Sequence, residues 1–291
     1  MSFRSFEEIL EQCKEHNKPF WRVILEDDMQ ERMVTEEEAI EKMQGLYYAM
    51  KEADSSYDGS LLSASRLVGG DGHKMSQALQ EGKVLGGPFM GKVIAKALKM
   101  GESNACMKKI VAAPTAGSCG VIPAVLISYE EEYKASLQEM IEAMYVASGI
   151  GQIIGARAFL SGAAGGCQAE IGSASAMAAA ALTYLNGGDY ESIVHGAAMS
   201  LKNLLGLVCD TVGGLVEVPC VKRNVIGAVT AIASADMAVA GIRSQIPPDE
   251  VIDAMREVGE ALPKTLRETG EGGLGATPTG MKIKNRLLDQ S

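Results

Sequence analysis

The sequence predicts an all-α protein, a single multi-helix domain in which several glycine-rich loops converge on one site. Three observations support this fold class. Apolar residues recur at helical spacing behind capping signals, strands do not alternate regularly with helices, and small residues are abundant, with 33 glycines against an aromatic content of 5%. Small side chains let helix backbones approach closely. With 47% hydrophobic and 22% charged residues, the chain resembles an ordinary globular protein that buries a large core.

Residues 1–57 predict an N-terminal helical region that packs on the core or against a partner. Capping-box patterns begin at Ser5 and Thr35, and the second predicts a helix that reaches about Ala53. The remainder, 58–291, is expected to form the main helical domain.

The main domain is predicted to alternate glycine-rich loops with helices. Loops are expected at 58–75, 86–88 and 112–120, and again at 270–280, because their glycines and prolines interrupt a regular helix. From residue 121 onward the pattern is nearly all helical, with helices predicted at 137–149, 172–185, 190–207, 224–240 and 248–262.

Charge and hydropathy exclude several classes of partner. The formal net charge of −10 repels a polyanion, so we expect no nucleic-acid partner, and no polybasic run indicates a membrane surface. Acidic residues follow the first methionine closely, without the apolar segment of a secretory signal. Residues 171–190 are too weakly apolar to span a bilayer. The chain is therefore expected to be cytoplasmic, where its six cysteines do not form a disulfide framework.

Cys167, Cys209 and Cys220 each occupy a break between predicted elements, where a thiol can point into a shared cavity. Iron–sulfur clusters are held by such thiolates. The neighbouring Lys222 and Arg223 could offset the negative charge of three thiolates and bound sulfide.

The same cysteines also allow a simpler interpretation. Free cysteine is among the most buried residue types, and the long, irregular spacing differs from a compact cluster motif. Zinc is disfavoured because the chain has no Cys-x₂-Cys pair and no histidine pair. From spacing alone, a metal centre and ordinary core thiols both remain open.

The loop at 114–120 is a candidate carboxylate-binding loop. Thr115, Gly117 and Ser118 offer hydroxyl and backbone N–H donors, and a helix is predicted to start directly after the loop, where its dipole favours an anion. The alternative is an ordinary turn.

Among the three histidines, His73 is the candidate acid–base residue. It lies in a glycine-rich loop beside Asp71 and Lys74, and histidine is a common general acid or base in enzymes. His16 is expected to be a solvated side chain. His195 lies within a predicted helix and is expected to be a core group.

Four segments together indicate a family. They are Ala113–Ser118, Gly166–Gly172, the stretch from Cys209 to Cys220, and the glycine-rich stretch 272–280. These segments resemble the alpha chain of the iron–sulfur-dependent L-serine dehydratases, and the resemblance extends from about residue 60 to 280.

The resemblance implies an all-helical catalytic domain that carries a 4Fe–4S cluster, with Cys167, Cys209 and Cys220 as its three cysteine ligands. It implies an L-serine ammonia-lyase, which converts L-serine to pyruvate and ammonia in amino-acid degradation and gluconeogenesis, together with a separate beta chain. One iron without a cysteine ligand would act as a Lewis acid on the serine hydroxyl. The loop at Thr115 and Ser118 would hold the substrate carboxylate, and His73 or the beta chain would supply the base.

Two alternatives remain at this point. An iron–sulfur hydro-lyase acting on another small hydroxy acid would use the same open iron. A metal-free helical interaction subunit would carry the cysteines only as core residues.

Overall fold

A computed structural model describes residues 3–289, and the fold within this range is all-α, as predicted. No strand occurs among these residues; an isolated bridge joins Cys209 to Arg267. The α-helices are α1 (Phe6–His16), α2 (Phe20–Arg32), α3 (Glu36–Ser55), α4 (Asp71–Gln80), α5 (Gly87–Ala105), α6 (Val121–Tyr133), α7 (Leu137–Arg157), α8 (Gly162–Gly165), α9 (Ser173–Leu185), α10 (Tyr190–Lys202), α11 (Cys220–Val239), α12 (Pro248–Ala261) and α13 (Pro278–Leu288). A π-helix, Gln168–Gly172, leads into α9, and 3₁₀-helices cover Val212–Gly214, Lys264–Leu266 and Gly273–Ala276.

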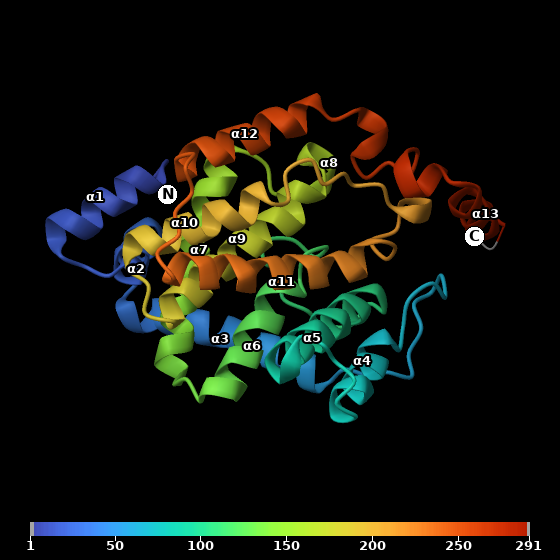
Figure 1. Cartoon of the computed structure of the whole chain (residues 1–291), viewed down its shortest axis with the longest axis horizontal. Coiled ribbons are helices and arrows are strands. Elements are labelled where there is room, and N and C mark those ends of the chain that lie inside the picture. The colour runs from blue at the N-terminus through green and yellow to red at the C-terminus, as the bar shows by residue number, and fades with distance from the viewer. Residues whose placement is uncertain (1–2, 290–291) are drawn as a thin grey trace.

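Helix α9 lies at the centre of the molecule (Figure 1). Its sequence is mostly alanine and serine, and every residue from Ser173 to Thr183 is buried. Helices α6, α7, α10 and α11 pack around it. Side chains of one or two heavy atoms allow these four neighbours to approach one central helix, and the close approach maximises dispersion contacts.

The N-terminal helices build a second layer against α7. Helices α2 and α3 both contact α7, and the buried side chains there are bulky, including Phe20, Tyr47 and Tyr145. Both hydrogen bonds of the capping box predicted at Thr35 are present. At Ser5, the side chain accepts a hydrogen bond from the Glu8 amide. The hydrophobic core is continuous from α1 to α12; the predicted division after residue 57 stays a prediction.

Several element boundaries differ from the predicted ones. Helix α10 ends at Lys202 instead of residue 207, because the chain turns at Gly206 in the left-handed region, with φ of 81°. Helix α11 begins at Cys220, earlier than the predicted 224. The predicted final loop ends at Thr277, whose side chain caps α13. The loop predicted at 58–75 ends at Gly70, because α4 begins at Asp71. Helices α4, α5 and α6 were not delimited by the sequence pattern.

Three connections position the functional site. They are the turn between α8 and the π-helix, the segment that precedes α11, and the segment that follows α12. The last two pair briefly: the Cys209 amide donates to the Leu266 carbonyl at 2.8 Å, and the Glu268 amide donates to the Cys209 carbonyl at 2.8 Å. Within the described range, no helix is both long and apolar enough to cross a membrane.

Candidate metal centre

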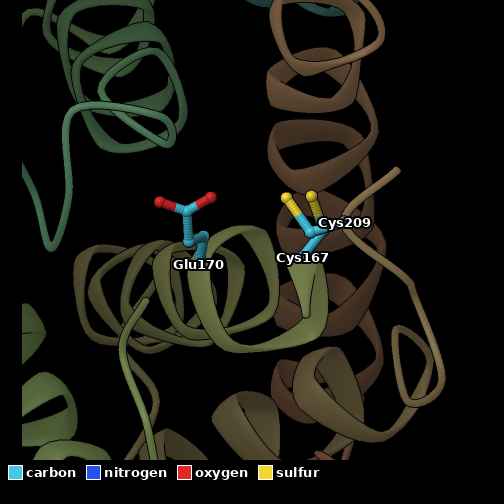
Figure 2. A group of neighbouring side chains, drawn as sticks. All are labelled: Cys167, Glu170 and Cys209. Carbon is cyan, nitrogen blue, oxygen red and sulfur yellow. The ribbon is translucent and has the colours of Figure 1, made fainter. Parts of the chain in front are cut away.

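Cys167 and Cys209 bring their sulfur atoms together in a buried site. Figure 2 shows the two thiols side by side, with the carboxylate of Glu170 pointing in the same direction from the adjacent helical turn. One ligand atom of each of these three residues lies within 4.8 Å of the others, and all three residues are buried. Two thiolates and a carboxylate at this spacing are a donor set that could bind a metal ion.

Local backbone geometry explains how Cys167 and Glu170 share a face. Gly166 has a φ of 79°, a conformation that glycine adopts without steric cost, and it ends α8 directly before Cys167. The following π-helix turn spans Gln168–Gly172; such turns are frequent at functional sites. Gln168 fixes the turn, because its side-chain amide donates to the Met255 carbonyl at 3.1 Å and accepts from the Gly206 amide at 2.9 Å.

Cys220 approaches the same site from the first turn of α11, and it is buried. It is outside the 4.8 Å set, but the charges of Cys167 and Glu170 act on it. The structure therefore brings Cys167 and Cys209 into contact distance and places Cys220 close by. The other free cysteines, Cys13, Cys106 and Cys119, lie elsewhere in the chain and were not predicted as ligands.

Arg223 supplies positive charge to this site. Its guanidinium lies 3.4 Å from the Cys167 sulfur, donates to the Val208 carbonyl at 2.7 Å and pairs with Asp210 at 2.8 Å. Asp210 in turn accepts from the Leu274 amide at 2.9 Å. The arginine is thereby held in place beside a sulfur, where it favours the thiolate form.

The pKa values of the three thiols are shifted in different directions. A hydrogen bond from Cys209, together with the charge of Arg223, lowers the pKa of Cys167 against the opposing effect of burial. The same hydrogen bond and burial raise the pKa of Cys209. Burial raises the pKa of Cys220, and the neighbouring Cys167 adds to this. Metal binding at all three would therefore release protons and depend on pH.

Glu170 is a site residue that the sequence analysis did not single out. Its side chain is 8% exposed, and the Thr115 hydroxyl donates to it at 2.7 Å. Burial raises the pKa of the Glu170 carboxyl; the Thr115 hydrogen bond opposes this, and the Glu268 carboxylate adds to it. A signal was available, because Glu170 is the single charged residue between Arg157 and Asp189.

Glycines surround the Glu170 carboxylate. A Cβ atom on Gly117 would lie 3.0 Å from both carboxylate oxygens. A Cβ atom on Gly162 would lie 3.0 Å from the Glu170 Oε2, 3.0 Å from the Cys209 sulfur and 3.3 Å from the Glu268 Oε2. At both positions the absence of a side chain therefore lets these polar atoms approach the glycine backbone closely.

The predicted carboxylate-binding loop lies next to Glu170. Asn224 anchors it, because its side-chain amide donates to the Gly117 carbonyl at 2.9 Å and accepts from the Gly120 amide at 2.8 Å. Thr115 and Ser118 contact each other through their hydroxyls at 3.1 Å. The successive backbone N–H groups of 116–118 donate to no acceptor in the described part of the chain. Consecutive free N–H groups form an anion-binding concavity.

The histidines occupy different environments. His73 lies in the first turn of α4, where it is exposed, its side chain lies against Gly59, and its backbone amide donates to the Tyr57 hydroxyl at 3.3 Å. Asp71 of the same turn pairs with Lys222, close to Cys220. His195 accepts a hydrogen bond from the Ser244 amide at 3.2 Å, and burial lowers its pKa, which fits the predicted structural role.

Comparison with known proteins places this chain in a family. The profile of the family described as "Serine dehydratase alpha chain" matches residues 15–275. The chain is 44% identical to the "Probable L-serine dehydratase, alpha chain" of Bacillus subtilis over 98% of this chain and 95% of that protein. It is 41% identical to the "L-serine dehydratase, alpha chain" of Peptoniphilus asaccharolyticus over 97% of each.

A longer relative aligns with almost the same part of the chain. The "L-serine dehydratase" of Helicobacter pylori is 32% identical over 94% of this chain and 62% of that protein. Since the profile spans most of the chain and two relatives match it nearly end to end, the chain belongs to the serine dehydratase alpha chain family.

Proposed function

We propose that this chain is the alpha subunit of an L-serine dehydratase, which converts L-serine to pyruvate and ammonia with the help of an iron–sulfur cluster. The observation that carries the proposal is the meeting of buried thiols from separate elements, Cys167 after α8 and Cys209 before α11, beside the guanidinium of Arg223. Family membership supports the activity, since the matched relatives are named as L-serine dehydratases.

The residues present fit a cluster held by Cys167, Cys209 and Cys220. Thiolates are the ligands that iron–sulfur clusters use, and these three thiols are nearly inaccessible to solvent. The absence of a side chain at Gly162 lets the Cys209 sulfur approach the backbone there. When bound, a cluster with one iron free of a protein ligand would supply a Lewis acid for the substrate hydroxyl.

The loop at Thr115, Gly117 and Ser118 is proposed to hold the substrate carboxylate. The free N–H groups of 116–118 support this. The Thr115 hydroxyl already donates to Glu170, so in this arrangement the backbone N–H groups and Ser118 carry the carboxylate contact, and Thr115 orients Glu170.

Removal of the Cα proton requires a base, which we assign to His73 or to a group of the beta chain. The exposed imidazole of His73 can be reached by a partner, and the Asp71–Lys222 pair ties its helical turn to the start of α11. A beta chain is proposed because the matched relatives are named alpha chains and the Helicobacter relative contains sequence beyond the match. A His73→Asn variant that keeps kcat and its pH profile assigns the base to the beta chain.

Anaerobic reconstitution with iron and sulfide tests the proposed function. The wild-type chain is expected to bind about four irons, to absorb broadly in the visible range, and to deaminate L-serine when the beta chain is present. A protein that binds no iron, or that binds iron and leaves L-serine unchanged in the presence of its beta chain, contradicts the proposal.

A further inference from the structure

We infer that Glu170 and Glu268 bind the α-ammonium group of the substrate and thereby select amino acids over hydroxy acids of the same length. The inference rests on the proposed function, because it concerns recognition of the substrate in that same site. It assigns a binding role to two residues that were not among the predicted ligands.

The two carboxylates converge beside the Cys209 sulfur. The position that a Cβ atom of Gly162 would take lies 3.0 Å from the Glu170 Oε2, 3.3 Å from the Glu268 Oε2 and 3.0 Å from the Cys209 Sγ. Because residue 162 has no side chain, both carboxylates and the sulfur approach its backbone closely, and the two carboxylates therefore present their oxygens to the same place.

Neither carboxylate is neutralised by the protein. Within residues 3–289, neither Glu170 nor Glu268 takes part in an ion pair, while the nearby Arg223 is engaged by Asp210 and Cys167. The side chain of Glu170 is 8% exposed, and a buried carboxylate is costly unless a cation compensates it. Thiolates at the same centre add negative charge, which a bound ammonium group would compensate.

The neighbouring loop indicates what kind of cation fits. Gly117, whose Cβ position lies 3.0 Å from both oxygens of Glu170, belongs to the loop with the free N–H groups of 116–118. An anion-binding loop and an uncompensated carboxylate therefore lie next to each other. An α-amino acid carries its carboxylate and its ammonium on the same carbon and matches both neighbours at once, whereas a hydroxy acid offers Glu170 no charge.

The backbone ties Glu268 to the thiol segment. Glu268 has a φ of 65°, a left-handed conformation that is uncommon for residues other than glycine and that concentrates at functional sites. Its amide donates to the Cys209 carbonyl at 2.8 Å. The position of its carboxylate is therefore coupled to the position of the Cys209 sulfur.

The test uses the reconstituted alpha chain with its beta chain and two substitutions, Glu170→Gln and Glu268→Gln. The readouts are kcat and KM for L-serine, the calorimetric Kd of glycerate, in which a hydroxyl replaces the ammonium of serine, and the iron bound per chain. Glutamine keeps the size and removes the charge.

In Glu170→Gln we expect KM for L-serine to rise roughly ten- to hundredfold, as befits a lost hydrogen bond to a charged group. The half-buried Glu268→Gln is expected to change KM in the same direction by a smaller factor. Glycerate binding should stay equal or become tighter, and iron per chain should not change. The exposed Glu271→Gln is the matched control and should leave all readouts at wild-type values.

Two results overturn the inference. Loss of iron from Glu170→Gln to the level of a Cys209→Ser protein makes Glu170 a metal ligand. If the ratio of KM for L-serine to Kd for glycerate is unchanged in both variants, neither carboxylate binds the ammonium group. If Glu170→Gln does not fold, Glu268→Gln alone decides. If the wild-type enzyme deaminates L-serine and both variants keep this ratio, only this inference is contradicted. If the wild-type enzyme does not deaminate L-serine, the proposed function is contradicted.

Discussion

In two buried regions of this molecule, a glycine allows different kinds of atoms to approach the backbone. Between α2 and α7, a Cβ atom on Gly149 would lie 2.6 Å from Ile24 and 3.0 Å from Phe20, so the glycine makes room that large apolar side chains fill. At the candidate metal centre, the atoms that approach the backbone of Gly162 are a sulfur and two carboxylate oxygens instead. The first region gains stability from close packing, and the second keeps polar groups together in a buried place.

The side chains that stabilise the fold and those of the candidate metal centre therefore lie in different regions. The bulky side chains Phe20, Tyr47 and Tyr145 are packed away from the thiols, between α2, α3 and α7. The thiols lie among small residues at helix ends, where buried charge has to be compensated by neighbours such as Arg223. Substitutions in the two regions should therefore change different observables.

The largest effect is expected from Cys209→Ser. Loss of one of two contacting thiols should reduce iron per chain to background and abolish L-serine deamination, since serine is a poor ligand for a cluster. Iron quantitation and pyruvate formation measure this, and Cys106→Ser, a half-buried thiol outside the site, is the control that should retain both. A Cys209→Ser protein with full activity would rule out the cysteine assignment.

The next largest effect is expected from Phe20→Ala, in the packed region between α2 and α7. Removing a fully buried aromatic side chain is expected to lower the free energy of unfolding by about 3–5 kcal/mol. Chemical denaturation of the metal-free chain measures the change. The folded fraction should still bind iron as wild type does; a variant that keeps its stability but loses iron contradicts the separation of the two regions.

Gly162→Ala tests the role of the glycine at the candidate metal centre itself. The added methyl group has to displace the Cys209 sulfur or the Glu170 carboxylate by a few tenths of an ångström, at a cost of about 1–3 kcal/mol. We expect lower iron occupancy and a raised KM for L-serine with the helical content intact by circular dichroism. Ala163→Ser, on the exposed side of the same short helix, should behave as wild type.

The smallest effect is expected from Gly45→Ala in α3. No atom lies within 4 Å of the added Cβ, so the alanine should raise the free energy of unfolding by about 0.5–1 kcal/mol through its better helix propensity. Thermal unfolding measures the gain, with no change expected in iron content. A loss of stability here would show that glycine 45 has a packing role.

Much of the fold followed from the sequence because its signals are local. The capping box at Thr35, the proline start of α12 and the uncharged stretch of α9 each report on a few neighbouring residues, and the all-α class follows from their periodicity. Boundaries were less certain where a turn overrides the pattern. The end of α10 before Gly206 is one such position.

The sequence by itself determined the helical class and, through resemblance, the family, and it predicted the three cysteines at element breaks as cluster ligands. It did not reveal that Glu170 and Glu268 meet beside Cys209, because they lie 39 residues or more from Cys209 along the chain, on different segments. Only tertiary packing decided that Gly117 and Gly162 lie against the carboxylate of Glu170, and that Glu268 lies beside Gly162. The reason is physical: electrostatic and packing interactions depend on distance in space, which no local pattern of residues encodes.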